Sequence, residues 1–253
     1  MRGGIPEGIT SQIFAIGGGD LVTRETYEID RQIVQASGRS RPWTLCVTAA
    51  ANDSPEACDA FGNIYGDSLR CRTDYLRLIK GEPGGDDYKR KIARNEIFYF
   101  SDGDLDSLMN AVKEYGIIDD LRGAYNRGAV FCGVGAGAAA LGQLGLVAKT
   151  DAKGEAKNAL GIVDVNIACF GEGQTGRGEE AAAAFAAQNL PGFVLEYMAT
   201  LHIVENEFRM ITEESRGSGF AIAGKQVVEG SSEYQSLGSV AATSAGSKTK
   251  QKV

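Results

Sequence analysis

The chain has 253 residues, of which 43% are hydrophobic and 23% charged, an ordinary composition for one α/β domain that excludes wholesale disorder. Its 26 basic and 33 acidic residues give a net charge of −7. This balance argues against a nucleic-acid partner, because phosphate binding requires clustered Lys and Arg. No apolar run approaches the roughly 20 residues that cross a bilayer, so we expect no membrane partner.

Cysteine and histidine usage narrows the chemistry further. The five cysteines are widely spaced and form no CxxC pair, which predicts neither a zinc site nor a disulfide framework. No secretory signal is recognisable at the start of the sequence, so we expect a reducing, cytoplasmic setting with no cofactor and no metal. The chain has a single histidine, His202, so a mechanism that needs a histidine base must use that residue.

Strand-like and helix-like segments alternate along the chain. Apolar, β-prone runs predict strands at 12–16, 43–49, 73–79, 96–100 and 129–132. Amphipathic segments between them predict helices at 26–36, 55–66, 88–94, 105–115 and 119–126. After residue 146 the pattern loosens, with strands predicted at 160–170, 208–211, 220–223 and 226–228 and a helix at 179–188. The right-handed crossover rule then predicts a mostly parallel sheet with helices on both faces.

The composition changes at Gly230, where the chain turns to Ser, Gly, Ala and Lys with few apolar residues. We therefore expect one domain over residues 1–229 and a flexible tail over residues 230–253.

The junction between the strand at 129–132 and the alanine-rich helix that follows it is the most informative stretch. A sharp turn of small residues between a strand and a helix is where α/β hydrolases expose a nucleophile, because the helix N-terminus stabilises developing negative charge. Such a turn reads Gly-x-Ser-x-Gly or Gly-x-Cys-x-Gly. Here it reads GVGAG, and its middle residue, Gly135, has no side chain.

Several segments together resemble the peptidase E and cyanophycinase family of serine peptidases. The opening IFAIGGGD with ETYEIDRQIV is similar to the family's first strand, glycine loop and helix, and DDLRGAYNRGAVFCGVGAGAAAL is similar to its Leu-Arg-x-Ala-Tyr-x-Arg-Gly and Gly-x-Ser-Ala-Gly-Ala segment. The resemblance runs from about Ile13 to Glu229. It implies the class I glutamine amidotransferase-like (flavodoxin-like) fold, a three-layer α/β/α arrangement.

The resemblance also implies which positions would carry catalysis. The nucleophilic serine falls on Gly135 and the catalytic histidine on Cys169. The glycine-rich loop whose backbone helps to form the oxyanion hole reads SDGD, which places Gly103 and Asp104 there together with Ala136 after the turn. The acidic member of the triad falls on Glu213 or Glu214, the only component retained. We expect the two carboxylates of the SDGD loop to oppose an oxyanion.

Two functional hypotheses follow. In the first, the chain is a catalytically inactive homologue that serves as a binding or assembly protein, as a homo-oligomer or with a protein partner. In the second, it remains a hydrolase of Asp-X dipeptides or cyanophycin-like polymers. Engineered removal of a serine would explain Gly135 but not the absence of a histidine at Cys169. Losing both nucleophile and base removes most serine-type catalysis, so we favour the first hypothesis.

The remaining candidates have structural explanations that we prefer. We expect Cys169 to be a small buried thiol rather than a relocated nucleophile, because no base or positive neighbour lies near it in sequence. We expect His202 to be structural. Asp102 and Asp104 supply too few ligands for a hard cation and are expected to be solvated. Four residues of an apolar stretch either form an interface or pack on the domain's own sheet: Tyr197, Met198, Leu201 and Ile203.

Overall fold

The structure is a computed structural model that describes residues 10–81, 87–148, 154–212, 218–223 and 226–240. The described strands form two sheets. The larger one, here called the main sheet, has the order β14-β11-β10-β1-β5-β4-β2-β3. Its strands are β1 (Gln12–Ile16), β2 (Trp43–Val47), β3 (Arg72–Leu76), β4 (Ile97–Phe100), β5 (Val130–Val134), β10 (Thr200–Val204), β11 (Glu207–Ile211) and β14 (Gln235–Ser236).

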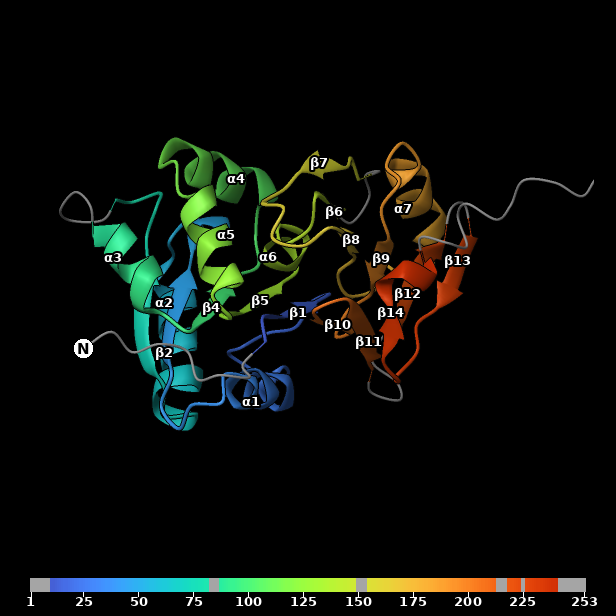
Figure 1. The fold of residues 1–253 in the computed structure, drawn as a ribbon. Helices are drawn as coiled ribbons and strands as arrows, with labels where there is room; N and C mark the ends of the chain where they lie inside the picture. Colours follow the sequence, from blue (N-terminus) through green and yellow to red (C-terminus); the bar gives the residue numbers. More distant parts are fainter. Residues whose placement is uncertain (1–9, 82–86, 149–153, 213–217, 224–225, 241–253) are drawn as a thin grey trace, which may run out of the picture.

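The main sheet is mixed, with one parallel and one antiparallel half. Strands β1, β5, β4, β2 and β3 pair in parallel. On the other side of β1, the strands β10, β11 and β14 pair antiparallel. The prediction of a mostly parallel sheet therefore holds only for the first half, which lies toward the left of Figure 1.

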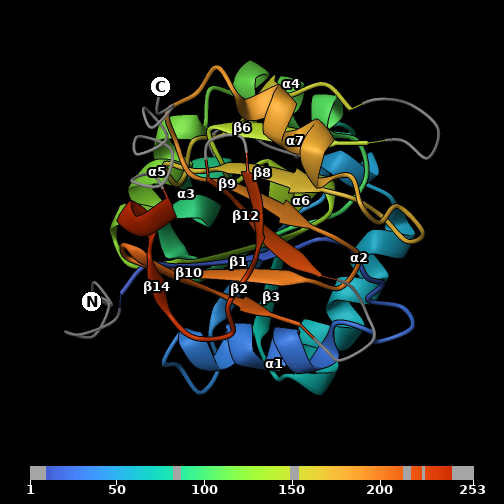
Figure 2. The ribbon, with the colours of Figure 1, turned by 90° about the vertical axis from the view of Figure 1, so that its right-hand side faces the viewer.

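Helices cover both faces of the parallel half, as the three-layer prediction requires. The helices are α1 (Tyr27–Ala36), α2 (Pro55–Phe61), α3 (Asp87–Arg94), α4 (Leu105–Glu114), α5 (Ile118–Asn126) and α6 (Ala136–Ala139), with a 3-10 turn η1 (Ala49–Ala51) and a π-helical turn η2 (Gly62–Ser68). Buried side chains of α1, α2 and η2 pack on one face. Those of α3, α4, α5 and α6 pack on the other. Figure 2 shows α1 below the strands and α4 above them.

A second sheet was not predicted. Its order is β13-β12-β9-β8-β6-β7, and β6, β8 and β9 are parallel while the others are antiparallel. Its strands are β6 (Leu144–Val147), β7 (Lys157–Asn158), β8 (Asn166–Cys169), β9 (Gly192–Leu195), β12 (Gly219–Ala223) and β13 (Gln226–Glu229). Helix α7 (Gly178–Phe185) covers one face through Ala181 and Phe185, and the opposite face joins the main core. The strand predicted over 160–170 is thus confined to Asn166–Cys169.

The apolar stretch 193–205 connects the two sheets. Strand β9 ends at Leu195 in the second sheet, and β10 begins at Thr200 in the main sheet. The turn between them closes with a hydrogen bond from the Ala199 N–H to the Glu196 carbonyl at 3.0 Å and holds Met198 at a φ of +68°. A single run of apolar residues thus supplies two strands in different sheets.

The stretch 193–205 offers no exposed interface, so that part of the prediction is wrong. Leu201 and Ile203 are fully buried in the core of the chain itself, and Met198 is buried as well. Tyr197 is half-buried and donates from its hydroxyl to Glu25 Oε2 at 2.6 Å. The alternative, that these side chains pack within the domain, is confirmed.

The fold also continues beyond the boundary predicted at Gly230. Strand β14 pairs with β11 through the registers Glu207–Ser236 and Phe208–Gln235. Val240 is buried, and the half-buried Leu237 packs against the main core. Residues 231–240 are therefore part of the domain rather than a flexible tail, and residues 241–253 lie outside the described part of the chain.

Candidate functional site

The predicted site lies where the parallel strands of the main sheet end. Strand β5 leads directly into α6 through Gly135, and β4 leads into the loop of residues 101–104 before α4. Strands β4 and β5 are neighbours, with Phe100 opposite Gly133. The two loops that the resemblance assigns to the nucleophile and to the oxyanion hole therefore lie side by side, as open α/β sheets generally arrange their ligand sites.

Gly135 forms a sharp turn between strand and helix. Its φ is +51° and its ψ is −111°, a backbone conformation that glycine adopts without steric cost and other residues adopt only with strain. The turn is held by hydrogen bonds from the Gly135 N–H to Ile16 O at 2.8 Å and from the Ala139 N–H to Gly135 O at 3.0 Å. The geometry of a nucleophile-bearing turn is thus present, but without a nucleophile on it.

The carboxylate of Asp102 fills the space where a side chain on residue 135 would lie. Asp102 Oδ1 accepts hydrogen bonds from the Gly103 N–H at 2.7 Å and the Ala136 N–H at 2.8 Å. A Cβ on Gly135 would overlap this carboxylate. Gly103 and Ala136 are two of the three positions that the resemblance assigns to the oxyanion hole. The structure brings their N–H groups together on one negatively charged oxygen of the chain itself.

Asp104, the third such position, bonds to other partners: its N–H donates to Ala50 O at 2.9 Å. It is the N-cap of α4, and its Oδ1 accepts from Ser107 N at 2.8 Å and from Ser107 Oγ at 3.0 Å. A capping carboxylate of this kind satisfies an otherwise unpaired N–H of the first helical turn. The expectation that both acids of the SDGD loop are merely solvated is therefore wrong: Asp102 is exposed yet hydrogen-bonded, and Asp104 caps a helix.

Cys169 is a buried thiol, as predicted. It ends β8 and is 1% exposed. Burial raises the pKa of its thiol far above the usual value, and the negative charge of Asp102 raises the pKa further. The side chain therefore stays protonated at neutral pH and lacks the thiolate that nucleophilic attack requires.

The residues predicted for the acidic position, Glu213 and Glu214, lie outside the described part of the chain. The structure points to another buried acid that the sequence reasoning missed. Glu196 is 6% exposed and directly follows Leu195, which pairs with Cys169 across β8 and β9. Its carboxylate accepts from the backbone N–H groups of Gly176 at 2.9 Å and Ser218 at 3.2 Å. A glutamate that ends the apolar run FVLE was the available signal.

His202 is structural, as expected. It lies on β10 opposite Phe14, on which its ring stacks with a centroid separation of 4.0 Å. Its Nε2 lies 2.9 Å from Gln12 Oε1, and its Nδ1 lies 2.9 Å from the Tyr234 hydroxyl. Burial, followed by the charge of Arg209, lowers the pKa of His202 to about 4. Gln12 begins β1 whereas Gly135 lies past its end, so this imidazole is not placed to act at the turn.

Within the described residues, no group of three or more His, Cys, Asp or Glu side chains is arranged to hold a metal ion. No helix in the same part of the chain combines the length and hydrophobicity needed to cross a membrane.

Comparison with known proteins places the chain in a family. The sequence profile of peptidase family S51 matches residues 13–211, more than half of the chain. The chain belongs to peptidase family S51. It is also 24% identical over 216 residues to an uncharacterized peptidase, YgaJ, of Bacillus subtilis (strain 168), covering 83% of this chain and 91% of that protein.

Solved structures agree with the S51 assignment at the level of the fold. A crystal structure of a peptidase from an acI-B1 Actinobacterium superposes with a TM-score of 0.66 at 16% identity, covering 90% of this chain and 97% of the other. A putative peptidase E from Listeria monocytogenes EGD-e superposes with a TM-score of 0.58 at 13% identity, covering 81% and 100% respectively. The resemblance to the peptidase E family is therefore confirmed.

Proposed function

We propose that this S51 chain is a non-hydrolytic member of its family, retained as a binding or assembly protein. The observation that carries the proposal is the carboxylate of Asp102 on the N–H groups of Gly103 and Ala136. In a serine-type hydrolase, two such donors stabilise the negative oxygen that develops during acyl transfer. Here an internal negative charge already occupies them, next to a residue that has no side chain.

The other catalytic positions support the same conclusion. A serine nucleophile requires a base that takes its proton, and the position assigned to that base holds the buried, protonated thiol of Cys169. Glu196 or a neighbouring acid supplies at most the acidic member of the triad. That acid orients a histidine, and it performs no chemistry when no histidine lies between it and the nucleophile.

The first test is an assay of hydrolysis. We expect the purified protein to release no product from Asp-X dipeptides or from cyanophycin above the buffer rate. Turnover that stays with the protein through successive purification steps and survives a Cys169→Ala change would contradict the proposal and favour the hydrolase hypothesis.

Reconstruction of the site provides the second test. Gly135→Ser alone is expected to stay inactive, because the serine lacks a base and its side chain overlaps Asp102. Adding Cys169→His supplies a base but leaves the carboxylate in place. The triple variant with Asp102→Gly is therefore the form in which hydrolysis is expected. The same triple with Ala at position 135 is the matched control, and activity in Gly135→Ser alone would show that another base reaches the site.

The proposal includes self-association or a protein partner as the means of action. Light scattering at micromolar concentration, together with affinity purification from the native source, tests this part. A strictly monomeric mass with no partner that co-purifies would contradict it, whatever the hydrolysis assays show.

A further inference from the structure

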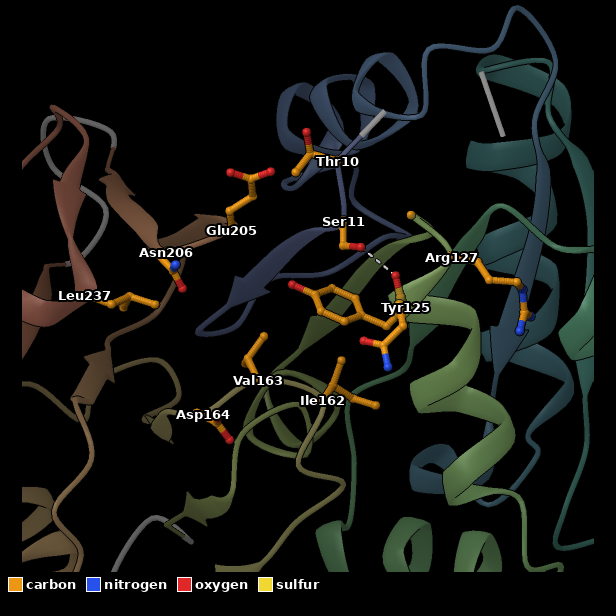
Figure 3. Close-up of a pocket in the computed structure, with 12 residues that line it drawn as sticks. Thr10, Ser11, Tyr125, Arg127, Ile162, Val163, Asp164, Glu205, Asn206 and Leu237 are labelled. Atoms are coloured by element: carbon orange, nitrogen blue, oxygen red, sulfur yellow. Dashed lines mark hydrogen bonds between the residues drawn. The ribbon is translucent and has the colours of Figure 1, made fainter. Parts of the chain in front are cut away.

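A cavity of about 650 Å³, drawn in Figure 3, lies where β1 and β5 begin. Its walls come from the residues before β1, the end of α5, residues 162–164, the turn between β10 and β11, and Leu237 after β14. Small-molecule pockets commonly enclose about 300–1,000 Å³. Because β1 and β5 begin here and the turn at Gly135 lies past their far ends, this cavity is separate from the site described above.

Hydrogen bonds fix the segments that form the cavity. The Ser11 hydroxyl donates to the Tyr125 carbonyl at 2.5 Å, which joins the start of β1 to the end of α5 (Figure 3). The Leu237 N–H donates to Asn206 O at 2.8 Å, which joins the residue after β14 to the β10–β11 turn. On the third side, Gln143 Nε2 donates to Asp164 Oδ1 at 2.9 Å. The walls are therefore formed before any ligand binds.

The lining combines apolar side chains with polar ones, among them the hydroxyl of Tyr125. Ile162 is buried, and Val163 and Leu237 are half-buried. Tyr125 directs its hydroxyl across the cavity toward the side on which Leu237 and Asn206 lie, and within the described residues this hydroxyl has no hydrogen-bond partner. Burial raises the pKa of Tyr125 to about 12, so the hydroxyl stays protonated at neutral pH and is available as a donor.

The charges at the rim favour a cation. Asp164 and Glu205 are exposed carboxylates on opposite walls. Arg127, the cationic residue in the lining, turns away from the cavity, and its guanidinium lies beside Gly123 of its own helix (Figure 3). Helix α5 ends here as well, and the C-terminal end of a helix carries partial negative charge.

We propose that this cavity binds a small organic cation: an ammonium or guanidinium group on a short apolar stem that also carries a hydrogen-bond acceptor. The cationic group lies at the rim beside Glu205, and Asp164 adds negative charge from the opposite wall. The stem packs on Ile162, Val163 and Leu237, and the acceptor receives the hydrogen bond from the Tyr125 hydroxyl. This inference does not depend on the loss of hydrolysis, since none of these residues belongs to the site at Gly135.

A matched pair of ligands tests the proposal by calorimetric titration of the full-length protein. N-acetyl-argininamide carries the guanidinium, a three-carbon stem and amide acceptors, whereas N-acetyl-citrullinamide has nearly the same shape without the charge. We expect the arginine compound to bind and the citrulline compound to bind about 3–5-fold more weakly, the upper end of the effect of an exposed ion pair. Raising the salt concentration should reduce the difference.

Variants assign the binding to this cavity. Glu205→Gln should raise the dissociation constant about 3–5-fold, Asp164→Asn about 2-fold, and Tyr125→Phe about 2–10-fold through one lost hydrogen bond. Asp119→Asn is the matched control: it lies at the start of α5, its side chain is 97% exposed, and the change should leave the dissociation constant unchanged.

Thermal unfolding confirms that each variant is folded. If Asp164→Asn unfolds, Glu205→Gln and Tyr125→Phe carry the test. No binding of the arginine compound at millimolar concentration, equal binding of the citrulline compound, or dissociation constants unchanged in the cavity variants would each overturn the proposal.

Discussion

The contact between Asp102 and the turn at Gly135 makes a quantitative prediction about stability. Replacing Gly135 by Ala introduces a Cβ into the space that the Asp102 carboxylate occupies. The carboxylate belongs to an exposed side chain and is free to swing toward solvent, but it then loses its bonds to the Gly103 and Ala136 N–H groups. Asp102→Ala removes the same two bonds without touching the backbone at position 135.

The expected magnitudes follow from these contacts. A non-glycine residue at a φ of +51° costs about 1–3 kcal/mol. Loss of the two charge-assisted bonds adds about 1–2 kcal/mol, at the low end for such bonds because Asp102 is exposed. Gly135→Ala should therefore lower the free energy of unfolding by about 2–5 kcal/mol in the natural chain. In the Asp102→Ala background only the backbone strain remains, about 1–3 kcal/mol.

Urea unfolding of the four proteins in this double-mutant cycle measures the difference directly. We expect the two substitutions to be non-additive by about 1–2 kcal/mol, because both remove the same hydrogen bonds. A solvent-exposed pair of acidic positions such as Asp119 and Glu114 serves as the additive control. Free energies that add within about 0.5 kcal/mol for Gly135 and Asp102 would refute the account of the carboxylate as a ligand of the two N–H groups.

Two further predictions concern pH. Burial raises the pKa of Asp30, which bonds to the Tyr65 and Thr26 hydroxyls, from 3.8 to about 6. The folded chain then binds more protons at Asp30 between these values, so the contribution of Asp30 to stability, measured as the difference from an Asp30→Asn variant, should fall by about 2–3 kcal/mol as pH rises from 4 to 7. Equally steep stability profiles for the two proteins would contradict this. His202, the chain's single histidine, has its pKa lowered to about 4, so its contribution to stability should be lost as pH falls from about 6.5 to 4. If NMR shows that the imidazole of His202 titrates with a midpoint near pH 6.5, its placement in a buried, hydrogen-bonded environment is wrong.

The parallel half of the main sheet was predictable because its signals are local. Each strand is a short apolar run, each helix has a regular apolar face, and the order of such units in the chain sets the crossovers. The division into two sheets was not predictable in this way. The stretch 193–205 is predominantly apolar, and its division between the sheets depends on the turn at Met198 and on the pairing of β9 with β8 and of β10 with β1.

The same distinction between local and long-range signals applies to the candidate site. The sharp turn at Gly135 was predictable from its run of small residues, and the family resemblance implied that Gly103 and Ala136 belong to one site. The role of Asp102 depends on a side-chain rotamer and on two donors contributed by different loops. Glu196 likewise becomes noticeable only when β8 and β9 are seen to be neighbours. Ala136, which binds Asp102, and Gly176 and Ser218, which bind Glu196, lie far away in sequence, and no local pattern encodes these contacts.

Gly135 and Asp102 are best understood as one coupled feature. An Oδ1 atom reaches the Ala136 N–H only because residue 135 has no Cβ, and the turn keeps its φ of +51° without strain only because that residue is glycine. An active serine hydrolase forms a negative oxygen only during the reaction. In this chain a carboxylate oxygen of Asp102 accepts from the two N–H groups permanently. The N–H groups of Gly103 and Ala136 therefore remain satisfied without any substrate. This arrangement explains how the strand-turn-helix geometry of an S51 site stays intact in a chain that we propose has no hydrolytic reaction to perform.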